Sequence, residues 1–212
     1  MKVLMGHFGE TGLIRNFKIL AIHDLNSMST TLYLSRIETE IGSMVTGVTE
    51  DAVLMLEFQK GSRVERKLEQ LHQKIDIVIQ MSRKKLHNEL QQQMEEFFKG
   101  ERSEFDLPMR TVGTEFQNRV WNLLLKIPAG QTVSYGDVAS YLGDYYTSED
   151  IATAAGINHI VILIPCHRLL GRDGSLVGYN GGIDRKKRLI EHEKDFFGDT
   201  GSVTEDVTTN VS

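Results

Sequence analysis

The sequence predicts an α+β fold in two parts, a small N-terminal antiparallel sheet with a helix and a mainly helical C-terminal part. Three observations support this prediction. Short apolar or alternating runs separated by turn signals fill residues 31–58. A polar stretch with helical spacing follows over 63–99, and beyond Pro108 short capped helices alternate with glycine-containing turns. The 212 residues suffice for one large domain or two small ones.

The N-terminal part is expected to span 31–106, after an extension over 1–30 of unknown role. Met28 is an alternative first residue of the protein, because the part of the sequence that carries the family resemblance described below begins just after it. Residues 63–99 are expected to be helical, and an amphipathic helix that covers the sheet is predicted by the spacing of Leu86, Leu90, Met94 and Phe97. The run 75–79 interrupts this stripe, which disfavours a coiled coil.

The C-terminal part is expected to span 107–194 and to begin with a helix that stops before Pro128 and Gly130. The buried face of this helix is formed by Phe116, Val120, Trp121, Leu123 and Leu124. Residues 195–212 form an acidic tail without a basic side chain, which we expect to be disordered.

Two further short helices are predicted in the middle of this part. Ser134 and Asp137 have the spacing of a capping box, which opens a helix that ends at Gly143. Thr147 or Ser148 caps the next helix, over 149–157. Two short helices joined by a tight loop are typical of the helix-turn-helix motif, although the small residues of the second helix are equally explained by close packing.

Cys166 is the only cysteine of the chain. It follows the apolar run 160–164, which predicts a buried strand that Pro165 ends. A lone cysteine in a core is commonly an inert apolar residue. The adjacent His167 favours a nucleophile instead, because a cysteine attacks as the thiolate and needs a base or a positive charge nearby.

A glycine-rich loop and a last helix follow the cysteine. Residues 177–182 contain three glycines, so the backbone of this loop can approach another surface closely. Residues 184–193 are predicted to be helical. The four cations at 185–188 are interpreted as a solvated helix face.

Composition narrows the class of protein. The formal charge of −5 argues mildly against a nucleic-acid-binding protein, although the segment 110–193 is neutral with nine basic and nine acidic residues. A single cysteine excludes an intramolecular disulfide and a cysteine-rich zinc site, and it fits a reducing compartment. No apolar run is long enough to span a membrane, and the N-terminus lacks the layout of a secretory signal.

Several motifs recur together along the chain. Near the cysteine they are Pro165-Cys166-His167-Arg168, Gly178-Tyr179-x-Gly181-Gly182 and His192-Glu193. Upstream they are Gly113-Thr114-x-Phe116-Gln117-x-x-Val120-Trp121, Ile127-Pro128-x-Gly130-x-Thr132-x-Ser134-Tyr135 and Asn158. With these motifs the chain resembles the methylated-DNA–protein-cysteine methyltransferases, also called O6-alkylguanine-DNA alkyltransferases. The resemblance is continuous over 114–193 and looser over 35–108.

The resemblance implies an RNase H-like N-terminal domain and a winged-helix-like, DNA-binding and catalytic domain with a helix-turn-helix. It implies a DNA repair enzyme that flips O6-alkylguanine, and also O4-alkylthymine, out of duplex DNA from the minor groove. The alkyl group would move irreversibly to Cys166, so that each molecule acts once. No cofactor or metal is implied, and we expect a monomer in the cytoplasm of a bacterium or the nucleus of a eukaryote.

The resemblance also implies roles for single residues. Cys166 would be the nucleophile, His167 would take its proton through a water, and Glu193 would orient the imidazole. Tyr135 would push at the phosphate of the flipped nucleotide and lend a proton to the departing guanine. Asn158 would hold the backbone of the active-site turn. Taken singly, Tyr135, Asn158 and Glu193 are better explained as a core-edge tyrosine, a turn asparagine and a helix glutamate. It is their occurrence together, in the order of the family, that favours the functional roles.

The residues expected to contact DNA are Tyr135, Gly136, Glu149, Ala152 and Arg172, and those expected to form the pocket loop are Val177, Gly178 and Tyr179. Glu149, followed by Asp150, stands where the family has an intercalating arginine. Acidic residues in a first helical turn stabilise the helix dipole, which is the structural explanation for both. Because a carboxylate cannot intercalate in place of that arginine, Tyr145 or Tyr146 is the candidate for a substitute wedge, that is, a side chain that fills the space left by the flipped base.

Two alternatives remain open from the sequence. Glu149 fits a family member that binds lesions but repairs them poorly. A Cys-His hydrolase unrelated to DNA is the remote alternative, and it would turn over repeatedly instead of stopping after one equivalent.

Overall fold

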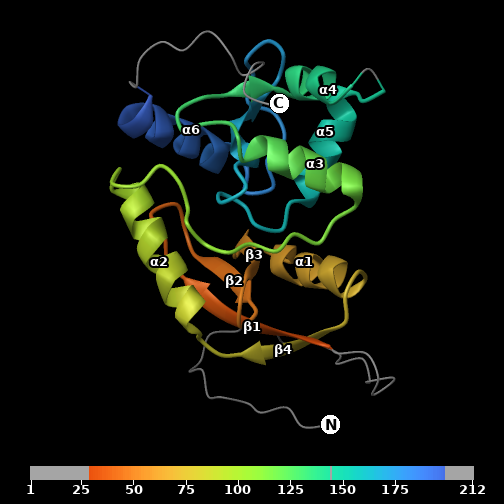
Figure 1. Ribbon diagram of the computed structural model, residues 1–212. Helices are drawn as coiled ribbons and strands as arrows, with labels where there is room; N and C mark the ends of the chain where they lie inside the picture. Colours follow the sequence, from red (N-terminus) through yellow and green to blue (C-terminus); the bar gives the residue numbers. More distant parts are fainter. Residues whose placement is uncertain (1–28, 144, 199–212) are drawn as a thin grey trace.

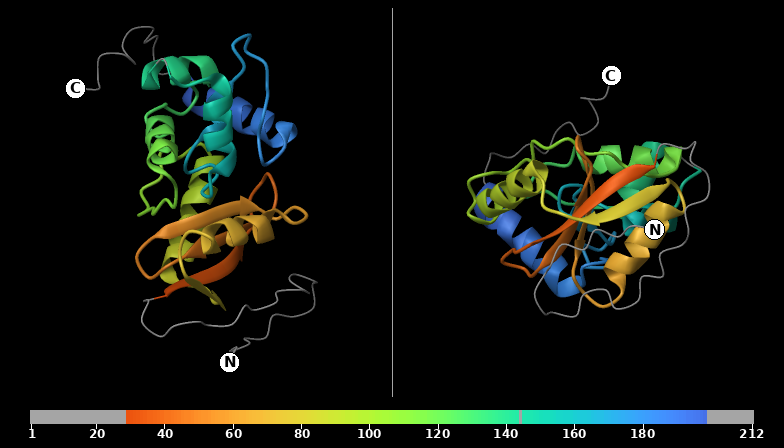
Figure 2. Two further views of the ribbon diagram at one scale, coloured as in Figure 1. Left: turned by 90° about the vertical axis from the view of Figure 1, so that its right-hand side faces the viewer. Right: turned by 90° about the horizontal axis from the view of Figure 1, so that it is seen from below.

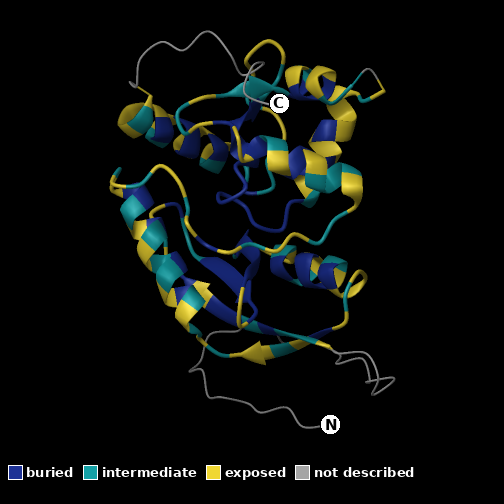
Figure 3. Cartoon of the chain, viewed as in Figure 1, coloured by how far each residue is buried: buried dark blue, intermediate teal, exposed yellow. Residues whose placement is uncertain are grey.

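The computed structural model describes residues 29–143 and 145–198, arranged as a lower half built on a sheet and an upper, mainly helical half (Figure 1). The expected extension over 1–30 and the expected tail over 195–212 therefore lie mostly outside the described residues, as does Met28. Residues 195–197 are described, and they are helical, so the disordered tail was predicted to begin too early. Figure 3 shows buried residues concentrated in the sheet and in the turns between the two halves.

The predicted antiparallel strands are confirmed. Strands β1 (Thr30–Ile37), β2 (Met44–Val48) and β3 (Val53–Phe58) form a meander in which Ser35 lies opposite Thr46 and Thr46 opposite Leu56. A fourth strand, β4 (Ile77–Met81), pairs in parallel with β1, which gives the order β3-β2-β1-β4.

The prediction of a helical stretch over 63–99 is wrong in its middle. Helix α1 (Arg63–His72) and helix α2 (Lys85–Phe98) are separated by β4. The reason is the β-branched sequence from Ile75 to Ile79, which favours a strand when a partner edge such as β1 is free.

The two helices cover opposite faces of the sheet (Figure 2). On one face α1 buries Val64, Leu68 and Leu71 against the strands. On the other face α2 buries its predicted stripe, with Leu90, Met94 and Phe97 fully enclosed and Leu86 half-buried. The amphipathic helix expected from the sequence is thereby confirmed.

The C-terminal half contains helix α3 (Glu115–Leu124), helix α4 (Tyr135–Leu142), helix α5 (Ser148–Ile157) and helix α6 (Ile183–Phe197). Short strands β5 (Val133–Ser134) and β6 (Leu169–Leu170) pair in parallel. The predicted capping box of α4 is confirmed, because the side chain of Ser134 accepts from the backbone of Asp137 and that of Asp137 accepts in return. Thr147, rather than Ser148, caps α5 in the same way with Asp150.

The prediction of a buried strand over 160–164 is wrong, although the burial is confirmed. The chain reverses there, with the amide of Ile164 donating to the carbonyl of Ile160 at 3.0 Å and Ile162 at a φ of 73°. A β-branched residue is rare at positive φ, so the packed surroundings must hold the turn. A run of buried apolar residues satisfies such a turn as well as a strand, which is why the pattern misled.

Backbone hydrogen bonds join the two halves along the outer edge of β3. The amide of Val53 donates to Pro108 at 2.8 Å, and the amide of Leu56 donates to His159 at 2.8 Å. In return Val161 donates to Leu56 at 3.0 Å. One hydrophobic cluster contains residues of both halves, so the active-site turn rests directly on the sheet. The predicted domain boundary near 106 stays a prediction.

Candidate active site

Cys166 lies in the core, between the two halves. It opens the short 3-10 helix η1 (Cys166–Arg168), and its amide donates to the carbonyl of Ile164 at 2.8 Å. The residue is only 5% exposed. Burial raises the pKa of its thiol, while the hydrogen bond from Asn158 and the charge of Lys67 act in the opposite direction. The thiol therefore needs a base to ionise near neutral pH.

Asn158 ties the turn of residues 160–164 together. Its Nδ2 donates to the carbonyl of Ile164 at 2.9 Å and lies 3.3 Å from the sulfur of Cys166. Its Oδ1 accepts from the amide of Ile160 at 2.9 Å. The one side chain thus spans the turn from its first residue to its last and also contacts the thiol. Its role in the reaction stays a prediction.

A buried network of His167, Arg168 and Glu193 lies behind the cysteine. Nε2 of His167 lies 2.8 Å from Oε1 of Glu193, and Arg168 donates to both carboxylate oxygens, at 2.9 Å from Nε and 2.8 Å from Nη2. Burial would raise the pKa of Glu193, but His167 and Arg168 outweigh it and lower that pKa to about 2. Burial lowers the pKa of His167, against the influence of Glu193. We therefore assign an ionised Glu193 and a neutral imidazole.

This arrangement fixes the tautomer of His167. An ionised carboxylate can only accept, so the imidazole proton lies on Nε2 and the lone pair lies on Nδ1. Nδ1 has no hydrogen-bond partner in the described part of the chain. Sequence reasoning named His167 and Glu193, but it assigned no role to Arg168, although this residue stands in the same motif.

Tyr135 begins α4 and points its hydroxyl at the pocket loop. The oxygen lies 3.2 Å from the carbonyl of Val177 and 3.0 Å from that of Gly178. Burial, together with the charge of Cys166, raises the pKa of Tyr135 to about 12. Its hydroxyl therefore keeps its proton at neutral pH.

Lys186 holds the same loop, and the interpretation of the four cations at 185–188 as a solvated helix face is wrong for this residue. Lys186 is fully buried, and its Nζ donates to the carbonyls of Val177 and Gly178. Burial lowers the pKa of Lys186 to about 8. The sequence contains a signal for this, because Lys186 shares a helical face with the buried Leu189 and Glu193.

Tyr179 packs the pocket loop against β3. Its ring lies edge-on to Phe58 at 6.4 Å and edge-on to His167 at 6.4 Å. Its hydroxyl is enclosed without a partner in the described residues, and burial raises the pKa of Tyr179. Val177 and Gly178 are exposed, and Gly178 has a φ of 54°, a conformation that favours glycine. The loop is thus anchored at Tyr179 and free on its outer side.

The residues expected to contact DNA lie at the surface, except Tyr135. Glu149, Ala152 and Arg172 are exposed, and Gly136 is half-buried. A Cβ at Gly136 would lie 3.6 Å from Arg172 and 3.5 Å from Ser148, so the starts of α4 and α5 and the turn at Arg172 are neighbours. Whether these residues contact DNA stays a prediction.

The acidic pair at the start of α5 divides into two roles. Asp150 completes the capping box with Thr147, whereas Glu149 makes no contact in that box. Tyr145, just before the helix, is 97% exposed. Tyr146 is instead stacked on Phe116, with ring centroids 4.4 Å apart and planes at 18°.

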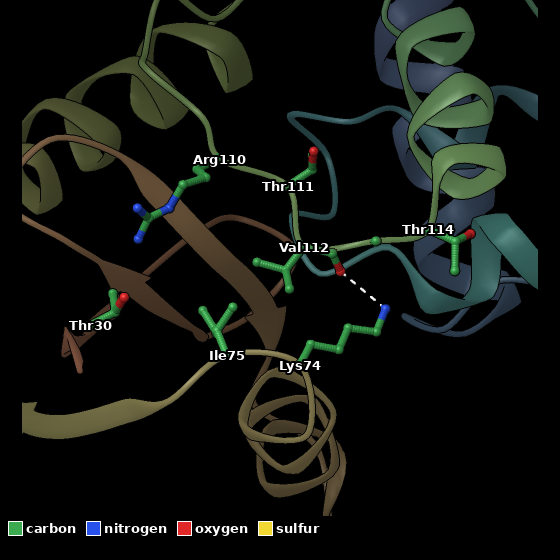
Figure 4. A pocket seen from close by; sticks show the side chains of 8 residues that line it. Thr30, Lys74, Ile75, Arg110, Thr111, Val112 and Thr114 are labelled. Carbon is green, nitrogen blue, oxygen red and sulfur yellow. Dashed lines mark hydrogen bonds between the residues drawn. The ribbon is translucent and has the colours of Figure 1, made fainter. Parts of the chain in front are cut away.

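The pocket drawn in Figure 4 is not the reactive site. It lies between the end of α1 and the linker 110–114, and it is lined by residues such as Lys74, Arg110 and Val112 (Figure 4). Nζ of Lys74 donates to the carbonyl of Val112 at 3.1 Å. No thiol, imidazole or carboxylate lines it, and Cys166, His167 and Glu193 are not among its residues.

Comparison with known proteins decides the family. Residues 115–195 match the family model described as 6-O-methylguanine DNA methyltransferase, DNA binding domain. A methylated-DNA–protein-cysteine methyltransferase of Methanosarcina acetivorans is 33% identical over 163 residues, which cover 76% of this chain and 98% of that protein. The chain belongs to the methylated-DNA–protein-cysteine methyltransferase family.

Other members of the methyltransferase family support the assignment. The protein of Mycobacterium tuberculosis is 47% identical over 102 residues, a match that spans 48% of this chain and 62% of that protein. The crystal structure of Mycobacterium tuberculosis OGT in complex with DNA has a TM-score of 0.64 and 30% identity, and it covers 78% of this chain and 94% of that one. The predicted α+β class is confirmed by this likeness. Within the described residues no helix is long and apolar enough to cross a membrane.

Proposed function

We propose that this methyltransferase family member repairs DNA by moving an alkyl group from O6-alkylguanine irreversibly to Cys166. The observation that carries the proposal is the buried thiol held by Asn158 beside the Glu193–His167 pair. In the reaction a bond forms between Sγ and the alkyl carbon, and the bond from that carbon to O6 breaks. The thiol proton is released and the departing guanine gains one, so the product is a thioether and each molecule acts once.

The geometry supports a division of labour for these protons. The neutral His167 presents an unpartnered Nδ1, which would accept the thiol proton through a water. Glu193 holds the ring and stabilises the imidazolium that forms, and Arg168 holds the carboxylate of Glu193 in place. Tyr135, which keeps its proton at neutral pH, would donate to the guanine as it leaves.

The burial of the thiol supports base flipping. A nucleophile that is 5% exposed cannot reach a base stacked inside a duplex, so the nucleotide must leave the stack at a cost of a few kcal/mol. The flipped base would displace the hydroxyl of Tyr135 from the carbonyls of Val177 and Gly178, and the outer side of that loop is free to move. We infer that Gly136, Ala152 and Arg172 then line the minor groove.

The finer expectations from the sequence belong to the same proposal. They are an RNase H-like first half, a winged-helix-like second half, activity on O4-alkylthymine, action as a monomer without a cofactor, and a cytoplasmic or nuclear location. The partner that we propose is double-stranded DNA, and the mycobacterial relative that was crystallised in complex with DNA supports it.

A second candidate function is lesion binding with weak repair. The exposed Glu149 favours it, because a carboxylate beside phosphates opposes DNA binding. The chemical groups around Cys166 are the same in both cases, so only the measured rate separates them.

The experiment is intact-protein mass spectrometry after incubation with duplex DNA that contains O6-methylguanine. We expect a gain of one methyl group per molecule, located on Cys166 and absent from Cys166→Ala. Slow transfer would support the weak-repair candidate. Absence of the adduct would contradict the proposal. Repeated turnover of an ester or amide without modification would favour a Cys-His hydrolase.

A further inference from the structure

A cluster of three buried ionisable residues lies near Cys166, and none of them belongs to the groups that the proposed transfer step uses. Glu57 belongs to β3, Lys67 belongs to α1, and His159 lies just before the turn of residues 160–164. Each of the three is at most 6% exposed. The proposed transfer step assigns no role to any of them. Because burying charge is costly, such groups need an explanation.

Lys67 reaches from the N-terminal half to the end of α5. Its Nζ donates to the carbonyl of Asn158 at 2.7 Å and to that of Gly156 at 3.2 Å. The last carbonyls of a helix lack partners within the helix and carry its negative dipole end, so a lysine is favourable there. In Figure 1, α1 lies directly below this part of the C-terminal half.

The residue that Lys67 holds is the one that contacts the thiol. Asn158 is bound through its carbonyl by Lys67 and through its side chain to the sulfur of Cys166, 3.3 Å away. A displacement of Asn158 would loosen both the turn and the thiol. Lys67 therefore supports the reactive sulfur through a single intervening residue.

The charge of Lys67 is not neutralised by a direct ion pair in the described residues. Glu57 accepts from the amide of Phe58 at 2.9 Å through Oε1, and its Oε2 has no partner. Burial lowers the pKa of Lys67 to about 8, against the charges of Glu57 and Cys166, while Arg63 and Arg66 on its own helix act with burial.

The groups that face Cys166 come from several elements. Lys67 and Lys186 lower the pKa of its thiol, and Glu57 raises it. The charge of Cys166 in turn raises the pKa of Tyr135 and of Tyr179. Asn158 contacts the sulfur directly. His159 has a pKa of about 3 because of burial, so it is neutral at working pH.

We propose that Lys67 is a positioning residue for the reaction of Cys166. From the N-terminal half it fixes the end of α5 that carries Asn158, and it places a positive charge near the thiolate as that thiolate forms. Its role in alkyl transfer rests on the proposed function, whereas its effect on the thiol does not.

The test uses the full chain and a simple electrophile, iodoacetamide, which reports on Cys166 alone because the chain has no other cysteine. The rate is followed by intact mass between about pH 6 and 10, a range that brackets ordinary thiol ionisation. Lys67→Met keeps much of the apolar stem and removes the charge. We expect it to move the midpoint of the pH profile up by about one unit, which is about a tenfold slower reaction at neutral pH.

Three further variants separate charge from packing. Lys67→Arg should retain the parent midpoint, and Glu57→Gln should lower it. The midpoint of the double variant Glu57→Gln/Lys67→Met should lie below that of Lys67→Met and above that of Glu57→Gln. If Lys67→Met does not fold, the comparison of the double variant with Glu57→Gln takes its place. Lys74→Met is the matched control, since Lys74 also bridges the halves, through Val112 and Gln117, but away from Cys166.

Two results would overturn the inference. One is a folded Lys67→Met with the parent profile, and the other is an equal shift in Lys67→Arg. Methyl transfer from O6-methylguanine duplex is measured in parallel. A parent that reacts with iodoacetamide but takes no methyl would contradict the proposed function alone, because the order of the iodoacetamide midpoints still tests Lys67.

Discussion

Glu193 accepts a hydrogen bond from His167, with 2.8 Å between Oε1 and Nε2, and both side chains are buried. This pair predicts that Glu193→Gln slows the chemical step by about 10²-fold or more, because an amide neither fixes the tautomer nor stabilises the imidazolium. Single-turnover rates and equilibrium binding to a lesion duplex measure the two effects. Binding should change little.

The matched control for this prediction is Glu191→Gln on the exposed side of the same helix. Glu191 lies 3.7 Å from Lys187 in a surface ion pair, which contributes little to stability. An equal loss of binding and chemistry in Glu193→Gln would indicate that the carboxylate acts mainly by holding Arg168 and the last helix.

Cys166→Ser should abolish transfer and keep the fold. A hydroxyl is close in size to a thiol, but its pKa is far too high for His167 to ionise it. Intact mass after incubation with the lesion duplex gives the activity, and thermal unfolding gives the stability. Transfer near the parent rate would remove Cys166 from its role.

Glu149→Arg should speed transfer from duplex DNA and steepen its dependence on salt. The change replaces an exposed carboxylate by a planar cation that can stack and reach phosphate. The cost is small, well under about 1 kcal/mol of helix-dipole energy, because Asp150 and not Glu149 completes the helix cap.

The test compares the transfer rates of the parent and of Glu149→Arg at two salt concentrations. Each rate is measured with duplex substrate and with free O6-benzylguanine, which needs no base flipping. Glu149→Gln serves as the control that removes the charge without adding a cation. Unchanged or slower duplex repair in a folded Glu149→Arg would mean that this residue does not face DNA.

Tyr145 and Tyr146 should respond differently to alanine. Tyr145 is 97% exposed, so its loss should leave stability unchanged and slow duplex repair if it is the wedge. Tyr146 is stacked on Phe116, so its loss should cost about 0.5–1.5 kcal/mol or more of folding free energy. Urea unfolding measures the stability of the two variants, and transfer from duplex DNA measures their repair rates. Full duplex activity in Tyr145→Ala would exclude this wedge.

His159 should make the protein less stable in acid. Burial lowers its pKa to about 3, so as pH falls below about 6.5 the unfolded chain takes up a proton that the folded chain does not. Stability is therefore fully present above about pH 6.5 and is lost progressively towards pH 3. His159→Phe should flatten this dependence in urea titrations at about pH 7 and 5.

The flattening will be partial, because burial also lowers the pKa of His167 and acts in the same direction. His72→Gln, at an exposed position of α1, is the control. An unchanged slope in His159→Phe would show that the ring is protonated in the folded state.

Local signals predicted the local structure. The helix that begins after Ser134 was predicted from a capping box within four residues of sequence, and the next helix from a cap at Thr147 or Ser148. The strand at Ile77 was missed because its identity depends on a free edge of β1, more than forty residues earlier in the chain. The turn at Ile162 was missed because burial alone does not reveal whether a chain continues or reverses.

The candidate site was predictable where residues stand in one motif. His167 lies next to Cys166, and Glu193 was found through the resemblance. Lys67 was not predictable, because it contacts Asn158 across 91 positions of sequence and nothing near it marks a contact. Only the packing of the two halves reveals it.

The strand β3 has a consequence for association between molecules. Val53–Phe58 is apolar apart from Glu57 and lies at the end of the sheet order, where an open edge recruits strands from other chains. Residues 108–110 and 159–161 occupy that edge with their own backbone groups. The segment that carries the reactive cysteine thereby also shields the sheet. Heating that separates the C-terminal half from the sheet would expose the apolar edge of β3. We therefore expect thermal inactivation to proceed by aggregation rather than by reversible unfolding.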